Sequence, residues 1–150
     1  MATTYKLGMD AKIYYGTAAA DATAAAALTP ATLTVMNNVK DVNISHETGE
    51  ADVTTRGNSG FRATAATLKE CSIDFQMVVQ PSDAGFTAIK NAWLNGTEIA
   101  LAAITGNASG DEGPIGNFSI TNFSRNEGLE EAIVVDVTAK LSLWGSWYTV

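Results

Sequence analysis

Residues 50–80 read EADVTTRGNSGFRATAATLKECSIDFQMVVQ and change character half-way along. The first part is polar, contains glycine and carries both charges, whereas apolar and polar side chains alternate strictly from residue 70. A period of two is typical of a β-strand with one face in the core and the other in solvent. We therefore predict a half-buried strand at 70–80, preceded by a long polar loop at about 50–66. Its core parity holds Cys71, Ile73, Phe75, Met77 and Val79, and its polar parity holds Glu70, Ser72, Asp74 and Gln76.

Other segments along the chain also have extended character. The last long run aligns Ile133, Val135 and Val137 against Asp136, Thr138 and Lys140. Within 117–125, Phe123 is out of phase with Phe118 and Ile120, which indicates a bulge. Residues 106–116, GNASGDEGPIG, are predicted to be a turn-rich connection because of their glycines and proline. The strands predicted in addition to 70–80 are 5–15, 33–45, 97–105, 117–125 and 132–143.

One helix is predicted, in PSDAGFTAIKNAWLNG at residues 81–96. Ser82 or Asp83 can cap its N-terminus, and Asn95-Gly96 is a typical stop signal. Its apolar residues lie at helical spacing. The sequence thus predicts a mainly β protein, an antiparallel β-sandwich or barrel with one flanking α-helix at about 83–94. We predict a single domain over 1–150, with a variable alanine-rich loop at about 17–30 and a C-terminal tail at 144–150.

Composition and charge exclude several classes of protein. With 46% hydrophobic and 17% charged residues the 150-residue chain belongs with globular proteins. A net charge of −7 with scattered basic residues argues against binding a nucleic-acid backbone. No apolar stretch approaches the roughly 18 residues of a membrane span. A single cysteine excludes an intrachain disulfide, and the N-terminus lacks a secretory signal pattern, so we expect synthesis in a cytoplasm.

The search for catalytic chemistry finds no site. His46 is the one histidine and has no partner at metal-ligand spacing. Cys71 has the parity of the core, which indicates a buried, inert thiol. We therefore predict no enzyme, no metal and no cofactor. The carboxylates that could form an acid/base pair all lie in polar, turn-like stretches that favour solvated faces: Glu47, Glu50, Asp52, Glu127, Glu130 and Glu131.

Strands of about ten residues, such as 70–80 and 132–143, raise the question of their edges. An uncovered long edge is an aggregation hazard unless it is paired with another chain. The pattern therefore indicates assembly.

The order of motifs resembles that of phage major tail tube proteins. The central run DVNISHETGEADVTTRGNSGFRATAATLKECSIDFQMV at residues 41–78 is similar to the family's strand, polar stretch and alternating strand. KLGMDAKIYYG near the start, the helix DAGFTAIKNAWLNGTEIA and the late GPIGNFSITNFSRNEGLEEAIVVDVTAKLS look like the same family. The resemblance covers roughly residues 6–143, and the alanine-rich segment and the aromatic tail are less typical.

This resemblance implies a tube fold shared with contractile tails and type VI secretion. Six copies would form a ring, their strands would join in one inner β-barrel, and the rings would stack. The polar loop would reach the adjacent ring, with Glu50, Asp52, Arg56 and Arg62 available for contacts. The implied partners are further copies of the chain, tape-measure, tail terminator and baseplate or tail-tip proteins, and a sheath if the tail is contractile. The implied location is the virion tail, assembled in the host bacterial cytoplasm.

An acidic, polar wall would let DNA pass without specific binding, because it repels phosphate. As a hypothesis, the polar parity of the two long strands faces the lumen: Glu70, Ser72, Asp74, Gln76, Asp136, Thr138 and Lys140. The alternative is that this parity is an outer solvated face. In the tail, Trp144, Trp147 and Tyr148 are predicted to pack on the domain or on a neighbouring subunit.

Alternatives to a phage tail tube remain at this stage. A tube of a contractile injection, gene-transfer or secretion particle would share fold and assembly but differ in what it moves. A carbohydrate-binding sandwich would use the three aromatic residues of the tail for stacking. A hydrolase would use paired carboxylates.

Overall fold

The computed structural model describes residues 5–16 and 33–150. The predicted alanine-rich loop at 17–30 therefore lies outside the described residues. The elements are, in chain order, η1 (Gly8–Asp10), β1 (Lys12–Tyr15), β2 (Thr34–Val35), β3 (Val39–Asp52), η4 (Arg56–Asn58), β4 (Thr64–Val78), α1 (Ala84–Asn95), β5 (Glu98–Ile104), β6 (Glu112–Asn126) and β7 (Val134–Thr149).

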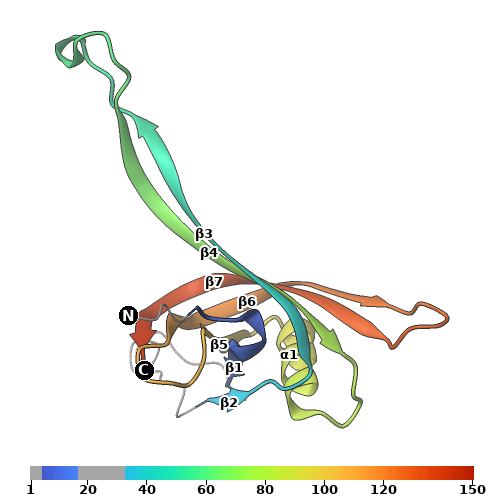
Figure 1. Cartoon of the computed structure of the whole chain (residues 1–150). Coiled ribbons are helices and arrows are strands. Elements are labelled where there is room, and N and C mark those ends of the chain that lie inside the picture. The colour runs from blue at the N-terminus through green and yellow to red at the C-terminus, as the bar shows by residue number, and fades with distance from the viewer. Residues whose placement is uncertain (1–4, 17–32) are drawn as a thin grey trace.

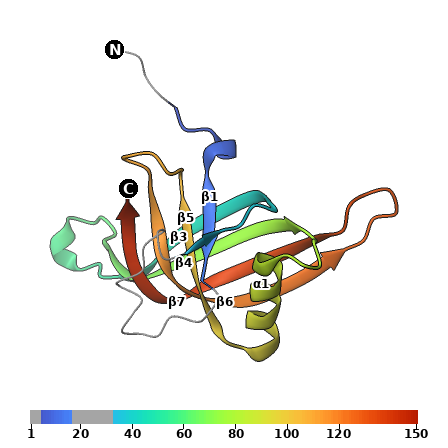
Figure 2. The same cartoon turned by 90° about the horizontal axis from the view of Figure 1, so that it is seen from below.

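The seven strands form one antiparallel sheet in the order β2-β1-β5-β6-β7-β4-β3. The sheet is strongly twisted, so that β1 and β5 run across the direction of β3, β4 and β7 (Figure 2). Two hairpins extend from the body: β3–β4 rises far above it, and β6–β7 projects sideways (Figure 1). The prediction of a mainly β, antiparallel fold with one helix is confirmed.

The core lies on one face of β4 and β7 and is covered by α1 and by the curled part of the sheet. Cross-strand register places Ile73 opposite Ala139 and Phe75 opposite Val137, all of them buried. Burial of the larger side chains, Ile73, Phe75 and Val137, stabilises the fold by about 1.5–3 kcal/mol each. The alternation seen in the sequence thus becomes the separation of a core face from a polar face.

Helix α1 begins and ends where the sequence predicts. The Asp83 side chain accepts a 2.8 Å hydrogen bond from the backbone N–H of Phe86, which caps the N-terminus. Gly96 adopts the left-handed conformation with φ of 64°, and its N–H bonds back to the last turn. Ile89 and Ala92 are buried against the sheet, whereas Trp93 and Leu94 remain exposed.

The prediction of a strand over 5–15 is wrong for its first half. β1 begins only at Lys12, which pairs with Ile104 at the end of β5. Residues 8–10 form a 3-10 turn, and the apolar residues Tyr5, Leu7 and Met9 are exposed. Periodicity misled here because a period of two predicts extended chain but does not supply a neighbouring strand.

The predicted strand at 33–45 is also interrupted. The two-residue strand β2 stands at its beginning, and β3 starts at Val39 after Asn38. Asn38 is buried, and its side-chain amide donates to the carbonyl of Val78 at 2.9 Å. This contact fixes the turn that separates β2 from β3.

The prediction of a turn-rich connection at 106–116 is wrong from residue 112 onward. β6 begins at Glu112 and carries Gly113, Pro114 and Gly116 within the strand. A Cβ atom on Gly113 would overlap the carbonyl oxygen of Ala103 on β5. The glycine therefore allows close strand packing and does not mark a turn. The predicted bulge near Phe123 is confirmed by the register shift between Ile120 and Asn122.

The C-terminal segment is part of the sheet. β7 runs to Thr149, and its last residues pair with the start of β6, Trp144 with Gly116 and Trp147 with Pro114. The boundary predicted at 144 is therefore not a boundary between a strand and a tail. Similarly, residues 50–52 and 64–66 are paired strands and not loop, since Glu50 lies opposite Ala66.

Candidate functional site

The polar face of the sheet brings together the seven residues that the sequence predicts for the lumen. Ser72 lies opposite Lys140, Asp74 opposite Thr138, and Gln76 opposite Asp136. Glu70 lies further along β4 on the same face. The core parity of these strands is buried, and the polar parity is half-buried or exposed. The residues thus form one continuous surface, and the direction in which it faces in an assembly stays a prediction.

Neighbouring strands widen this surface with residues that the sequence reasoning did not single out. Two polar rows run across the four strands β3, β4, β7 and β6, and a third runs across β4, β7 and β6. The alternation of Val42 and Ile44 with Asn43 and Ser45 was a signal for the contribution of β3. The register needed to place β6 was not visible in the sequence. The rows are Ser45-Ser72-Lys140-Ser119, then Asn43-Asp74-Thr138-Asn122, and then Gln76-Asp136-Ser124.

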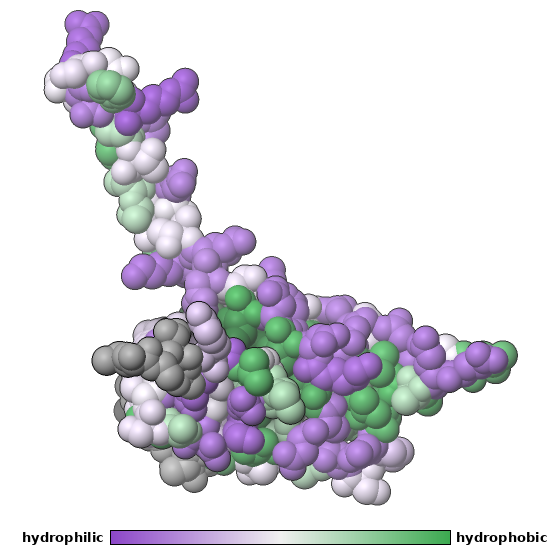
Figure 3. All heavy atoms as spheres, in the orientation of Figure 1, coloured by the Kyte–Doolittle hydropathy of each residue, from purple (hydrophilic) through white to green (hydrophobic). Residues whose placement is uncertain are grey.

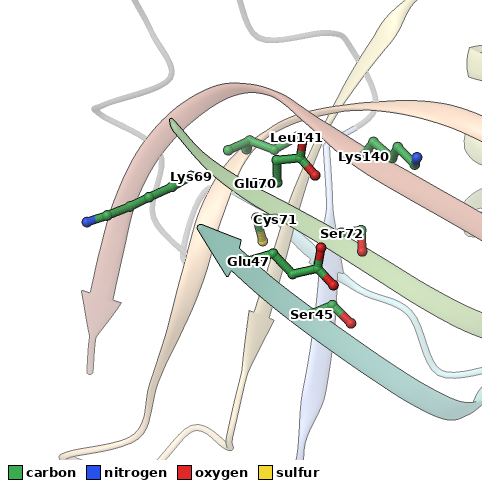
Figure 4. A pocket seen from close by; sticks show the side chains of 8 residues that line it. All are labelled: Ser45, Glu47, Lys69, Glu70, Cys71, Ser72, Lys140 and Leu141. Atoms are coloured by element: carbon green, nitrogen blue, oxygen red, sulfur yellow. The ribbon is translucent and has the colours of Figure 1, made fainter. Parts of the chain in front are cut away.

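The charge on this face is predominantly acidic. Glu47 lies directly opposite Glu70, a like-charged pair that is unfavourable within a single sheet. Two shallow open grooves cross the face, one near each end of the three rows. Figure 4 shows the first groove, with the carboxylates of Glu47 and Glu70 over β3 and β4 and with Lys69 and Lys140 pointing in opposite directions away from them. The second groove adds Asp41, Asp74 and Asp136.

The two ends of this four-stranded face have unequal neighbours. β3 is the last strand in the sheet order, so its outer edge has no strand partner among the described residues. On the other side, pairing of β6 with β5 ends at Ser119, opposite Glu98. Residues 120–126 of β6 therefore pair with β7 alone within the described chain. The face ends in two open strand edges.

The β3–β4 hairpin stands clear of the body. Pairing of β4 with β7 begins only at Ser72, and the strands before it form a two-stranded ribbon (Figure 1). Phe61 at the tip is 73% exposed and Leu68 on the ribbon is 83% exposed. A two-stranded hairpin alone is marginally stable in water. The ribbon thus has the properties of a segment that a neighbouring molecule covers.

The tip of this hairpin is nevertheless well formed. Val53 N–H donates to the carbonyl of Ala63, and Thr54 Oγ1 accepts from Ala63 N–H at 2.9 Å. The side chain of Asp52 accepts a 2.9 Å bond from the backbone N–H of Thr54, and hydrogen bonding to Thr54 lowers the pKa of that carboxyl. Asp52 thus shapes the turn. The other residues predicted for inter-ring contacts, Glu50, Arg56 and Arg62, are exposed.

The aromatic residues of the C-terminal strand have separate environments. Tyr148 packs against Tyr14, Ile104 and Ile115 of its own chain. Trp144 and Trp147 are partly exposed, and the Trp147 ring lies 5.5 Å from the ring of His46. Tyr148 therefore serves the fold, and only the two tryptophans have surface to offer to a neighbour.

Two residues considered for chemistry, His46 and Cys71, lie opposite each other on β3 and β4. Cys71 is buried, and burial raises the pKa of its thiol. Within residues 5–16 and 33–150, no group of three or more metal-binding side chains comes together. No helix of the same residues is long and apolar enough to cross a bilayer.

Comparisons with known proteins agree with this architecture. The family model described as "Phage tail tube protein" matches residues 13–143. The chain belongs to the phage tail tube protein family. A tail tube protein is a structural component of a particle, so the resemblance predicted from the sequence motifs is confirmed.

Solved tail tubes share the fold of this tail tube protein. The tail of an empty gene transfer agent particle, refined with C6 symmetry, has a TM-score of 0.71 at 17% identity, covering 97% of this chain and 99% of that one. The virion of a native gene transfer agent gives 0.69 at 16% identity, with coverage of 97% and 99%. The SPP1 tail tube gives 0.67 at 17%, with coverage of 91% and 75%. No curated protein matches the sequence.

Proposed function

We propose that six copies of this tail tube protein close into a ring by pairing the outer edge of β3 with residues 120–126 of β6 in the next copy. The observation that carries the proposal is the pair of open edges at opposite ends of one four-stranded face. Ring closure pairs both open edges of this four-stranded face, and this satisfies the backbone groups that an isolated copy leaves to water there. Six-fold symmetry is supported by the C6 tail of the gene transfer agent.

The strand directions fit this closure. The order β3-β4-β7-β6 is antiparallel throughout, so β3 and β6 run in opposite directions. Rotation about a ring axis keeps the direction of each strand along that axis. The β3 of one copy therefore meets the β6 of the next in antiparallel orientation, and the ladder continues around the ring.

The rings stack into a hollow tube whose lumen is lined by the polar face. The acidic rows repel DNA phosphates, so the tube conducts DNA without binding it specifically. The β3–β4 ribbon reaches the adjacent ring, where its exposed apolar residues become covered. The role is structural and not enzymatic. The tube is part of a virion tail assembled in the host cytoplasm, where it contacts tape-measure, terminator and tail-tip proteins, and a sheath in a contractile tail.

A second candidate is the tube of a gene-transfer particle. Two of the structural neighbours come from such particles, and they share the fold over almost their whole length. Fold and assembly are the same in both candidates, and the neighbouring genes distinguish them.

Electron microscopy of the purified protein over a range of concentrations tests the proposal. Six-fold rings and hollow tubes are expected. A protein that sediments as a monomer at every concentration, without rings, would overturn it.

A pair of proline variants tests the edge itself. Successive backbone N–H groups along a strand point to opposite sides. One of the variants Ser124→Pro and Arg125→Pro therefore removes a hydrogen bond to β7. The other removes an N–H group that points away from β7, toward the open edge. The variant whose monomer keeps the wild-type Tm identifies the outward group. That variant should fail to form rings, and normal rings from both variants would contradict edge pairing at β6.

A further inference from the structure

A groove separates the two ends of the curled sheet. It runs between β1 and β3, has a volume of about 450 Å³, and is open to solvent. Figure 3 shows apolar surface below the base of the long hairpin, in the region where β1 and β3 approach each other. We call it the seam groove, and its apolar lining includes Met9, Ile13, Met36, Val39, Val42 and Ile44.

The seam groove is built from core-side residues that the chain leaves uncovered. Val42 lies opposite Phe75 and Ile44 opposite Ile73, so both have the parity of the core. Phe75 and Ile73 are buried, yet Val42 is 39% and Ile44 is 37% exposed. Side chains on the core side of a sheet stay exposed at its edge when the layer that covers the core ends before that edge.

A matching apolar surface lies at the opposite edge of the four-stranded face. Phe123 of β6 lies on the core side, opposite Val137, and its ring stacks on Trp93 of α1 at 6.1 Å. Beside it, Leu94 of α1 is 61% exposed. We call Trp93 and Leu94 the helix patch. The helix patch therefore sits on the core side of the open edge of β6.

We propose that the helix patch of each copy docks into the seam groove of the next copy. This inference rests on the proposed pairing of β3 with β6, which brings the two edges together. In that pairing the core-side row Val42-Phe75-Val137-Phe123 of one copy continues into the same row of its neighbour, so both apolar surfaces fall on the same side of the joined sheet. The occupant is accordingly a second copy of this chain.

Charges at the two edges support the same orientation. In antiparallel pairing the start of β3 lies beside the end of β6. The start of β3 carries Lys40, and Lys12 lines the same groove, with Asp41 as the acidic residue there. The β6–β7 turn carries Glu127, Glu130 and Glu131, and only Glu127 has an ion-pair partner, Arg125, among the described residues. The basic end of one edge thus meets the acidic end of the other.

Cysteine cross-linking tests the contact. We design the double variant Val42→Cys with Leu94→Cys, treated with a short bismaleimide after ring assembly, and the two single variants as matched controls. A head-to-tail ring places residue 42 of one copy beside residue 94 of the next, and never like beside like. The double variant should give a ladder of cross-linked species up to the full ring, and each single variant should give none. Wild type, whose Cys71 is buried, sets the background.

Charge exchange gives an independent readout. Lys40→Glu alone and Glu130→Lys with Glu131→Lys should each weaken ring formation, whereas the combined variant should restore it. Leu94→Asp should raise the protein concentration at half assembly by about tenfold or more. All these residues are exposed, so the Tm of the monomer serves as the control for folding.

The outcomes separate this inference from the proposed function. Wild type could form rings while the double variant gives no cross-links and Leu94→Asp assembles like wild type. That result would overturn the docking of the helix patch into the seam groove and leave the proposed ring intact. Cross-linked dimers from the single variants would show a two-fold contact and would also overturn it. If wild type forms no rings at all, the proposed function fails first.

Discussion

Gly113 lies where β6 passes closest to β5, and the missing side chain is what permits the approach. A Cβ atom there would overlap the carbonyl oxygen of Ala103. Glycine and proline in a sequence usually indicate a turn, which explains why residues 112–116 were predicted to be a turn-rich connection. Their role in a strand becomes visible only when the neighbouring strand is in place.

Substitution of Gly113 by alanine should therefore destabilise the monomer by about 1–3 kcal/mol, because the two strands must move apart. Thermal unfolding followed by circular dichroism measures the effect. Gly8→Ala is the control, since no atom lies within 4 Å of the Cβ it would introduce, and its effect should stay within about 0.5 kcal/mol. Equal Tm values for Gly113→Ala and wild type would contradict the packing argument.

Asp111 joins three separate parts of the chain. Its buried carboxylate lies 2.5 Å from Lys6 Nζ, accepts from Thr105 Oγ1 at 3.1 Å and from Ala108 N–H at 2.9 Å. Its backbone carbonyl accepts from Val150 N–H. The Lys6 ammonium, with the hydrogen bonds from Ala108 and Thr105, lowers the pKa of the Asp111 carboxyl.

The lowered pKa predicts how stability depends on pH. The charged carboxylate is favoured in the folded state, so its contribution is fully present above the ordinary pKa of 3.8 and is lost as pH falls through the lower folded value. Asp111→Asn should have a lower Tm than wild type at pH 7, and the two should converge on acidification below about pH 4. Glu130→Gln, on an exposed turn, should follow wild type throughout. A Tm difference that stays constant at all pH values would contradict this role.

Among the elements, α1 is the one most fully encoded by local sequence. Its N-cap, its apolar spacing and its terminal glycine all lie within 81–96, and all are used as predicted. Strands are predicted less completely, because their ends depend on where a neighbour begins. β1, β3, β6 and β7 all have boundaries that the alternation alone did not place.

The cap of α1 makes a quantitative prediction. Asp83→Ala removes the acceptor for Phe86 N–H and should cost about 1 kcal/mol of stability. Asp83→Ser keeps a capping oxygen and should recover most of the loss. Denaturant unfolding of the two variants measures the difference, and equal destabilisation by Ala and Ser would show that the cap is not the cause.

The β3–β4 hairpin can be shortened without touching the core. Val53 and Ala63 are hydrogen bonded across the ribbon, so residues 54–62 can be replaced by Asn-Gly, which favours a two-residue turn. The monomer Tm should be unchanged, and rings should form but fail to stack. Electron microscopy measures tube length, and tubes of wild-type length would contradict the inter-ring role of the loop.

At the scale of the whole molecule, the two faces of the sheet differ in character. One face packs against the core and is left uncovered toward its two edges, the other is an acidic surface, and both ends of the acidic surface are open strand edges. The like-charged pair Glu47–Glu70 is unfavourable in the monomer and serves no packing role there. Such a face is consistent with a wall that must not retain phosphate.

Reversing the charge of this face tests the proposal that it lines the lumen. Asp74→Lys with Asp136→Lys should still give tubes, because both side chains lie on the polar face. The altered tubes should retain DNA at low salt and release it at high salt, since phosphate binding weakens steeply with ionic strength. Asp74→Asn with Asp136→Asn is the neutral control. Normal DNA delivery by particles built from the lysine variant would overturn that proposal.

The sequence by itself determined the properties that depend on neighbours along the chain: the alternation of β4 and β7, the limits of α1, the acidic charge and the motif order of the tail tube family. It also identified the seven residues that β4 and β7 contribute to the polar face, because parity is local, but not those contributed by β6. The tertiary structure alone decided which strands lie side by side, which edges stay open, and that the aromatic segment at 144–149 is a strand. Pairing joins residues far apart in the chain, such as Gly116 and Trp144, and no local period encodes that distance.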